Sequence, residues 1–461
     1  MSTVLQSVPF GVDHARLDAI YRREVAVFVA ARPRSAALLE RGRRSMPRGV
    51  PMAWFSGLWD HPVVFAASAA GATFTDVDGN EYLDFNLADS STFCGFAPEP
   101  VAEAVARRMR SGPQLFLADE NAIVVAEELA RRFGLPKWQL TLSASQANIE
   151  AIRLARAATG RSRVLVFDGK YHGLIDDTLS VLDEGRVTPE YVGLPTHAPA
   201  ETVIVPFNDA EAVAVALDHR DIACVITEPA LTNTGIVVAE PGFHEAVRAA
   251  CTRTGTVLIV DETHTLMCGF NGLGGRIGLQ PDMVTVGKAI GGGVPFGAYG
   301  MCEPIADLMS EPGSMPALSG APTGEIATGG TLAGSALQTA AARAALEHVL
   351  TQEAYQRTAV LGARLADGIE AALASAGLPW SVDRLWAKSG YRPHPERAQN
   401  GADARGRSSP PLSAAMRVWF ANRGIWEAGW WSGPAISCAT TAADVDRYTG
   451  AFSQLVDELA G

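Results

Sequence analysis

The chain has 461 residues, of which 48% are hydrophobic, so it can bury a large core, and its length alone indicates two or three domains. Its net charge of −12 argues against nucleic acid or an anionic membrane as a partner. The six cysteines form no CxxC pair and no metal-ligand spacing. Without a signal-peptide pattern or an apolar run near 20 residues, a cytoplasmic protein that binds no metal is expected.

The N-terminal part predicts one helix followed by a small β meander. Asp13–Ala31 has apolar residues at steps of mostly three and four, the spacing of an amphipathic helix. Short strands are predicted at Val63–Phe65, Thr73–Asp76 and Tyr82–Asp84. Pro98–Met109 predicts a helix that leads into a larger domain.

From residue 138 onward, strand patterns alternate with helix patterns. Such alternation predicts a mostly parallel sheet with helices on both faces. The predicted strands are Gln139–Leu142, Val164–Phe167, Val203–Val205, Cys224–Thr227, Val257–Val260 and Met283–Val286, and the predicted helices include Gln146–Ala158, Ala210–Leu217 and Gly242–Thr254.

The C-terminal part predicts loops and a return to a small domain. Pro312–Gly329 is rich in Gly, Pro, Ser and Thr and predicts a mobile loop. Gln338–Val349 predicts the helix that begins the return. Lys388–Ser409 is polar and predicts an inserted surface loop. The last helices are predicted at Ala414–Ala421 and Asp444–Leu459.

Two predicted strands end in functional groups. Asp261 follows Val257–Val260, and Lys288 follows Met283–Val286. Ligands bind at the carboxyl ends of strands in open α/β sheets. Taken singly, the acid could be a helix cap and the lysine a solvated side chain. Together they suit pyridoxal 5′-phosphate, which needs a lysine for its Schiff base and a carboxylate at its ring nitrogen.

The motifs around these two residues carry a family resemblance. Asp261–Thr265 reads DETHT, Pro281–Asp282 precedes the second strand, and Gly287–Gly293 reads GKAIGGG. The chain from about Met46 to its end resembles the class III aminotransferases, which are fold-type I pyridoxal phosphate enzymes. The pattern is similar to the branch of glutamate-1-semialdehyde aminomutase and the β-amino acid aminotransferases.

The resemblance implies an α/β fold of two domains. Residues 96–337 would form the large cofactor-binding domain, with a mostly parallel seven-stranded sheet between helices. Residues 1–95 and 338–461 would form a small α+β domain from both chain ends. The resemblance also implies a homodimer with active sites at the interface.

The resemblance also implies roles for the two strand-end residues and their neighbours. Lys288 would form the Schiff base and carry the proton during transfer. Asp261 would hold the pyridine nitrogen protonated. Thr263 stands where the family usually has Val, and His264 where it usually has Gln or Met. His264 could contact a cofactor oxygen or support the site from behind.

The phosphate site would lie where a helix begins. The family's S-G-T-E-A reads here as SASQA, which includes Ser143, Ala144 and Ser145. Free N–H groups and the helix dipole favour an anion there, although Ser at a helix start is also an ordinary N-cap. Thr331 matches the residue that completes the phosphate site of the neighbouring subunit.

Three further residues complete the expected cofactor pocket. The resemblance places Tyr171 as the ring that stacks on the cofactor, with His172 beside it, although Tyr171 could also be a core residue. Glu228 follows another strand and would support the site near Asp261. A structural ion pair at Glu228 is the alternative.

Substrate recognition is the least specific feature. Relatives that act on amino acids use an Arg from the N-terminal region as a carboxylate clamp, but residues 51–59 contain none. That segment supplies Trp54 and Trp59, and the C-terminal part supplies Trp430 with its neighbours Trp426 and Trp431. These aromatics would suit an apolar amine or could equally be core. Arg417 or Arg423 could enter as a clamp.

The sequence therefore predicts an aminotransferase that moves an amino group from an amine or amino acid to a keto acid or aldehyde. Transfer would run through a Lys288 Schiff base and pyridoxamine phosphate. One alternative is a glutamate-1-semialdehyde-type 2,1-aminomutase. Another is a non-catalytic cofactor-binding regulator, against which the chain keeps Lys288 and has no basic helix-turn-helix stretch.

Overall fold

The computed structural model describes residues 9–57, 63–309, 325–427 and 433–461. The chain divides into two compact units. The larger unit comprises Glu99–Tyr355 and Gln399–Asp403. The smaller unit comprises Met1–Pro98, Gln356–Ala398 and Ala404–Gly461, so it is built from both ends of the chain.

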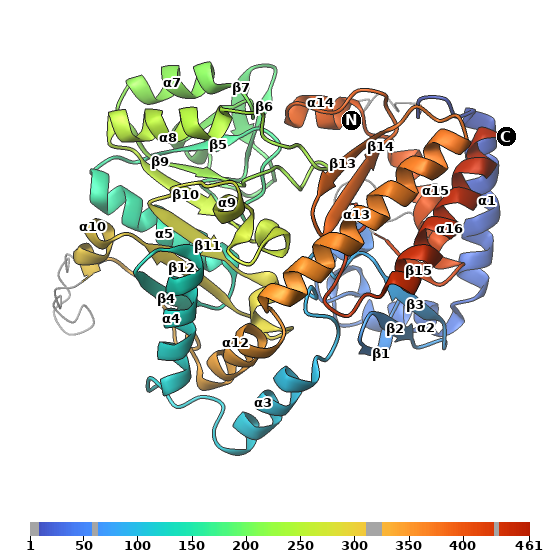
Figure 1. The fold of residues 1–461 in the computed structure, drawn as a ribbon, viewed down its shortest axis with the longest axis horizontal. Helices are drawn as coiled ribbons and strands as arrows, with labels where there is room; N and C mark the ends of the chain where they lie inside the picture. The colour runs from blue at the N-terminus through green and yellow to red at the C-terminus, as the bar shows by residue number, and fades with distance from the viewer. Residues whose placement is uncertain (1–8, 58–62, 310–324, 428–432) are drawn as a thin grey trace. The chain divides into compact units, whose positions relative to one another are not determined.

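A seven-stranded sheet forms the centre of the larger unit (Figure 1). The order across the sheet is β4-β12-β11-β10-β9-β5-β8, and β12 is antiparallel to both of its neighbours. The fold is therefore the predicted α/β fold of the type I enzymes. The strands are β4 (Lys137–Thr141), β5 (Arg163–Phe167), β8 (Thr202–Val205), β9 (Ile222–Thr227), β10 (Val257–Asp261), β11 (Met283–Val286) and β12 (Gly297–Met301).

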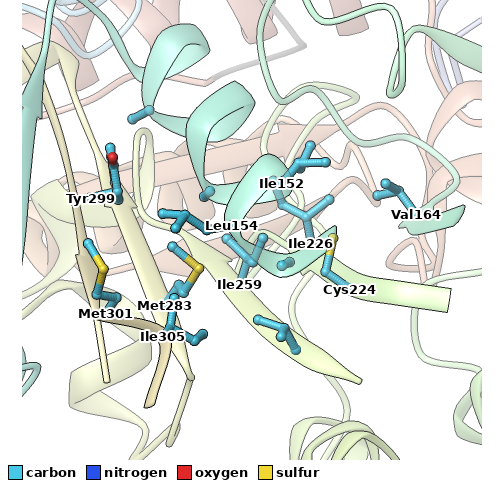
Figure 2. Close-up of a cluster of buried hydrophobic side chains, with 14 of the residues drawn as sticks. Ile152, Leu154, Val164, Cys224, Ile226, Ile259, Met283, Tyr299, Met301 and Ile305 are labelled. Carbon is cyan, nitrogen blue, oxygen red and sulfur yellow. The ribbon is translucent and has the colours of Figure 1, made fainter. Parts of the chain in front are cut away.

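Side chains of the central strands are buried on both faces of the sheet. All residues of β9, β10 and β11 are buried, which is why these strands read as continuous apolar runs. On one face, α5 (Ala144–Thr159) packs Leu154 into a cluster with Ile226 and Ile259 (Figure 2). On the other face, Phe167 meets Phe207 and Phe243 edge to face.

The helices of the larger unit begin and end at recognisable caps. α5 starts at Ser143, whose hydroxyl accepts from the N–H of Gln146, and ends at Gly160 in the left-handed region. α4 was missed by the sequence analysis, although Asp119 caps its start. The other helices are α3 (Glu99–Arg110), α4 (Glu120–Phe133), α6 (Ala198–Glu201), α7 (Ala210–Asp218), α8 (Phe243–Thr254), α9 (Gly272–Arg276), α10 (Glu303–Ala306) and α12 (Ala336–His348).

Two expectations for this unit need correction. β12 was not predicted, because its sequence GAYGM contains two glycines and lacks the usual strand-forming pattern. α12 was expected to begin the small domain but belongs to the larger unit, where it packs on α3 and α4. A hairpin of β6 (Ser180–Asp183) and β7 (Arg186–Pro189) completes the unit.

The smaller unit contains a four-stranded sheet of order β1-β2-β3-β15. β15 (Ile425–Trp426) pairs in parallel with β3 (Glu81–Asp84), which joins the two ends of the chain in one sheet. β2 (Thr73–Asp76) lies where predicted, but the first strand is β1 (Ala66–Ala70) rather than Val63–Phe65. Its sequence AASAA is small and largely exposed, so it carries no apolar signal.

The smaller unit also corrects the prediction for residues 388–409. β14 (Lys388–Arg392) pairs with β13 (Ser381–Leu385), and all of its residues are buried. α14 (Gly401–Gly406) follows in the same segment. The polar composition therefore does not mark a surface loop. The remaining helices are α1 (His14–Ala30), α2 (Pro33–Gly42), α13 (Gln352–Ser375), α15 (Pro410–Ala421) and α16 (Ala442–Ala460).

Some expectations concern residues that the structure does not describe. Most of the predicted loop Pro312–Gly329 lies outside the described residues, as do Trp59, Trp430 and Trp431. Among the helices that the structure describes, none combines the length and the apolar composition that a membrane crossing needs.

Candidate active site

Three functional side chains lie at one edge of the central sheet. β9, β10 and β11 are parallel neighbours, so their carboxyl ends lie side by side. Glu228 follows β9, Asp261 ends β10, and Lys288 comes two residues after β11. All three residues follow strands that the sequence predicts, and the pairing of the strands brings those strand ends together.

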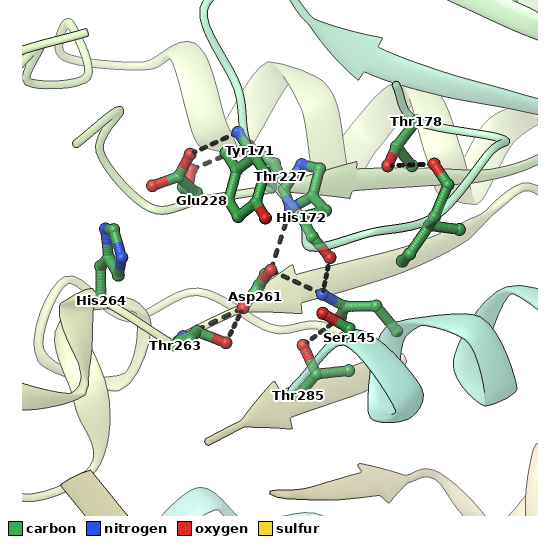
Figure 3. A network of polar contacts seen from close by, with 12 residues as sticks. Ser145, Tyr171, His172, Thr178, Thr227, Glu228, Asp261, Thr263, His264 and Thr285 are labelled. Atoms are coloured by element: carbon green, nitrogen blue, oxygen red, sulfur yellow. Dashed lines mark hydrogen bonds and ion pairs between the residues drawn. The ribbon is translucent and has the colours of Figure 1, made fainter. Parts of the chain in front are cut away.

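The carboxylate of Asp261 is buried and accepts hydrogen bonds at both of its oxygens (Figure 3). Oδ2 accepts from Nδ2 of Asn148 at 2.8 Å and from Nδ1 of His172 at 2.9 Å. Oδ1 accepts from the N–H and the hydroxyl of Thr263 at 3.0 and 2.5 Å. Burial alone would raise the pKa of Asp261, but His172 and the Thr263 donors lower it to about 2. The site therefore holds a fixed negative charge.

Asn148 orients this carboxylate and was missed by the sequence analysis. It is fully buried on α5, and its Nδ2 also donates to the carbonyl of His172 at 2.9 Å. Its Oδ1 accepts from the hydroxyl of Thr285 on β11 at 2.6 Å. A buried Asn inside a helix has no periodic signal, so only the fold reveals that it faces Asp261.

Lys288 has an unusual backbone conformation. Its φ is +50°, in the left-handed region that a side chain with a Cβ enters at a cost of about 1 kcal/mol or more. The preceding Gly287 is needed for space, because a Cβ there would lie 2.7 Å from the Cβ of Ala144. The amine of Lys288 contacts Nε2 of His264.

A second network starts at Glu228. Its Oε2 accepts from the hydroxyl of Thr232 at 2.6 Å, and its Oε1 lies 3.3 Å from the N–H of Tyr171. The same Thr232 hydroxyl lies 2.7 Å from Nδ1 of His264. Glu228 is thus joined through Thr232 and His264 to Lys288, and Thr232 was not singled out from the sequence.

The second residue of the DETHT motif supports the fold of the site. Glu262 is buried, and its carboxylate accepts from Thr265 and from the N–H groups of Leu273 and Gly274. Burial raises its pKa to about 7, although these donors act in the opposite direction. Glu262 therefore ties the turn after β10 to α9.

The start of α5 forms a crowded cradle of small residues. The Oγ of Ser143 accepts from N–H of Gln146, so this hydroxyl acts as the N-cap. The Oγ of Ser145 accepts from N–H of Leu174 at 3.3 Å. Gly173 lies against Ser145, because a Cβ at Gly173 would lie 2.1 Å from that Oγ.

The segment that carries Thr331 is tied to the same helix. Gln146 donates to the carbonyl of Gly329 at 2.8 Å, and Glu150 accepts from the Gly329 N–H at 2.9 Å. Gln114 donates to the carbonyl of Thr331 itself. Thr331 therefore lies in a turn whose backbone is held against α5.

The expected substrate residues have different positions. Trp54 is 53% exposed and its ring packs on Phe55 at 4.9 Å. Trp426 is partly buried and packs on the edge of a core cluster, with its ring against Phe74 and Tyr82. Trp59 and Trp430 lie outside the described residues.

The two candidate clamp arginines are engaged within the smaller unit. Arg417 is 3% exposed, donates to the carbonyl of Glu427 and lies over the ring of Trp426. Arg423 pairs with Glu24 at 3.1 Å and lies over another tryptophan ring. Within the described part of the chain, no group of three His, Cys, Asp or Glu side chains is arranged to hold a metal ion.

Comparison with known proteins agrees with this geometry. A family model, aminotransferase class-III, matches residues 56–382. A glutamate-1-semialdehyde 2,1-aminomutase from Anaeromyxobacter dehalogenans is 36% identical over 76% of this chain and 81% of its own length.

Solved structures give the same result. A glutamate-1-semialdehyde-aminomutase from Pseudomonas aeruginosa PAO1, a lysine-to-alanine variant in complex with PMP, has a TM-score of 0.92 and 37% identity and covers 98% of this chain and 100% of its own. A β-phenylalanine aminotransferase from Variovorax paradoxus has a TM-score of 0.84 and 26% identity over 95% of this chain and 97% of its own. The chain therefore belongs to the class-III aminotransferase family and is a fold-type I enzyme whose cofactor is pyridoxal 5′-phosphate.

Proposed function

We propose that this enzyme transfers an amino group between separate donor and acceptor molecules, and that its preferred donor has no carboxylate beside the amino group. The proposal for the donor rests on the absence of an available arginine at the positions considered for a carboxylate clamp. Residues 51–59 contain none, and Arg417 and Arg423 are already paired within the smaller unit. A substrate carboxylate left without a cation in a buried pocket would cost several kcal/mol.

The residues at the edge of the sheet fit the cofactor. Asp261 offers an ionised carboxylate, Lys288 an amine, and α5 an N-terminus with small residues around it. When bound, pyridoxal phosphate supplies an aldehyde that condenses with amines and a ring that accepts an electron pair. Lys288 would hold the cofactor and then move the proton, and Asp261 would keep the ring nitrogen charged.

The remaining contacts follow the same arrangement. We assign the phosphate to Ser143, Ala144 and Ser145 at the start of α5. Tyr171, 39% exposed, would cover one face of the ring, and Thr263 would lie under the other. His172 and Glu228 would act through Asp261 and His264, because those are the residues to which their side chains are linked.

Gly173→Ala should weaken cofactor binding by roughly tenfold or more. The new Cβ would displace Ser145, and the φ of +98° at residue 173 is unfavourable for alanine. Gly193→Ala is the matched control, because Gly193 has a φ of +93° but no atom near its Cβ position. Fluorescence titration of both variants with the cofactor measures the difference. An equal loss of cofactor affinity in the two variants would show that Ser145 is not part of the phosphate site.

An arylalkylamine should reduce the enzyme-bound cofactor faster than its carboxylated analogue. The expected advantage is about tenfold, or about 1.4 kcal/mol in the barrier. Stopped-flow absorbance of the bound cofactor, with donor and no acceptor, measures this first half-reaction. If the carboxylated member of the pair wins by a similar factor, a cation reads the carboxylate and the donor assignment is wrong.

The second candidate function is a 2,1-aminomutase. Several relatives, including one that is 36% identical, are glutamate-1-semialdehyde 2,1-aminomutases, which favours this function. Glutamate-1-semialdehyde given alone separates the two functions. A mutase converts it in many turnovers with no other carbonyl compound, whereas an aminotransferase needs an acceptor such as pyruvate and releases one keto product per transfer.

We also propose a homodimer that works in the cytoplasm. Leu115, Phe116 and Leu117 are 46%, 79% and 74% exposed, and large exposed apolar groups favour an interface. Gln114 of the same segment binds the backbone of Thr331, the residue expected to reach the partner's phosphate site. All six cysteines are free thiols, which supports a reducing compartment.

A further inference from the structure

The chain of contacts from Glu228 to Lys288 has a defined direction. The carboxylate of Glu228 is buried, and an ionised carboxylate can only accept hydrogen bonds. The hydroxyl of Thr232 must therefore donate its one hydrogen to Glu228, across 2.6 Å. Towards His264 the same hydroxyl can then only accept, across 2.7 Å.

This direction fixes the protonation of the imidazole. Nδ1 of His264 must carry a hydrogen in order to donate to Thr232. In the neutral ring, Nε2 then has a lone pair, and this is the nitrogen that contacts the amine of Lys288. His264 is buried, so water does not compete strongly for the contact.

We propose that Glu228, Thr232 and His264 form a triad that turns a bare imidazole nitrogen towards Lys288, so that His264 takes up one proton of the Lys288 ammonium and later returns it. The proposal rests on the assigned role of Lys288 as proton carrier. His264 touches the reacting amine and is a catalytic residue. Thr232 and Glu228 act through His264 and are positioning residues.

The proton step is balanced within these side chains. One N–H bond of the Lys288 ammonium breaks, and one N–H bond forms at Nε2 of His264. The electron pair left on Lys288 lets the amine accept a proton from the substrate carbon. Lys288 then delivers that proton to the carbon that receives it in the transfer and is again a neutral amine, so the reverse step returns the proton from His264 and restores the ammonium, with no oxidant or other reactant required.

The first test measures the tautomer directly in the holoenzyme. In protein labelled with ¹⁵N-histidine, long-range ¹H–¹⁵N spectra distinguish a protonated from a bare ring nitrogen. His264→Gln identifies the resonances of His264. His244 is the internal reference for the opposite tautomer, because its Nε2 donates to the carbonyl of Pro229 at 2.8 Å. The proposal predicts a protonated Nδ1 and a bare Nε2 at His264, and a bare Nδ1 overturns it.

The second test cuts the triad at a residue that does not touch Lys288. Thr232→Val keeps the shape but removes the hydroxyl, and should slow the half-reaction roughly tenfold or more. With a donor deuterated at the reacting carbon, its kinetic isotope effect should rise, because proton transfer becomes more fully rate-limiting. Thr232→Ser should restore the rate and the isotope effect. His244→Gln is the matched control and should leave both unchanged.

The outcomes separate this proposal from the function on which it rests. If the wild type forms no covalent link with the cofactor through Lys288, the assigned role of Lys288 fails, and the relay fails with it. If the wild type is active and Thr232→Val folds, binds the cofactor and keeps the wild-type rate and isotope effect, only the relay is wrong. If Thr232→Val does not fold, Thr232→Ser and the tautomer measurement on the wild type still decide.

Discussion

Lys288→Ala should abolish turnover, with a loss on the order of 10⁴-fold or more, as for other groups that form a bond during catalysis. The variant should still bind the cofactor, because the contacts of Asp261 and of the α5 N-terminus remain. Its visible spectrum should be that of the free aldehyde rather than of a lysine-bound cofactor. Steady-state assays and absorbance spectra measure the two effects.

The chain offers a clear control for this variant. It contains four lysines, at positions 137, 170, 288 and 388, and Lys137 is exposed at the start of β4. Lys137→Ala should therefore keep full activity and the wild-type spectrum. Substantial turnover in Lys288→Ala, with the cofactor bound, would exclude Lys288 as the covalent and proton-carrying group.

Asp261→Asn should lower the rate of the half-reaction roughly 100-fold or more, because a neutral amide cannot hold the ring nitrogen protonated. The asparagine keeps the shape of the side chain and can keep a hydrogen bond with Asn148 or with Thr263, so the main change is the loss of the charge. Asp282→Asn is the matched control, since Asp282 lies at the other end of β11 and binds Arg248. Single-turnover kinetics of both variants, with cofactor binding checked separately, gives the comparison.

Asp261 also makes a prediction about pH. Its pKa lies at about 2 in the folded protein, below the ordinary value of about 3.9 for an unfolded chain. The stability that follows is complete above pH about 4 and is lost as the pH falls towards 2. Asp261→Asn should lack this part of the acid dependence of unfolding.

A near-normal rate of the half-reaction in Asp261→Asn would show that the partner of the ring nitrogen is another group.

The sequence predicted those parts of the site that follow directly from strand ends. The apolar runs before Glu228, Asp261 and Lys288 are buried parallel strands. A one-residue error in the predicted end of such a strand still leaves the same functional residue at that end or close to it. The start of α5 was predictable for a similar reason, because a strand, a serine and a helix pattern follow each other. The six predicted strands account for the sheet except for β12, because the two glycines of β12 are more typical of a loop than of a strand.

The rest of the site depends on contacts between distant positions. Asn148 and Asp261 are 113 residues apart, and Thr232 and His264 are 32 apart. No periodicity in the sequence reports that these side chains face each other. The contacts of the arginines are hidden from the sequence for a related reason. Nothing in the sequence shows that Arg417 is buried against Glu427 and Trp426, as it is in the fold.

We propose that Lys288 is the residue that binds the cofactor, and reduction with borohydride tests this assignment. The holoenzyme is reduced, digested and analysed by mass spectrometry, and the cofactor-free protein is treated in parallel. With four lysines in the chain, each peptide can be assigned separately. The expected result is a pyridoxyl group on the peptide that contains Lys288 and on no other. A pyridoxyl group on the peptide of Lys137, Lys170 or Lys388 instead would contradict it.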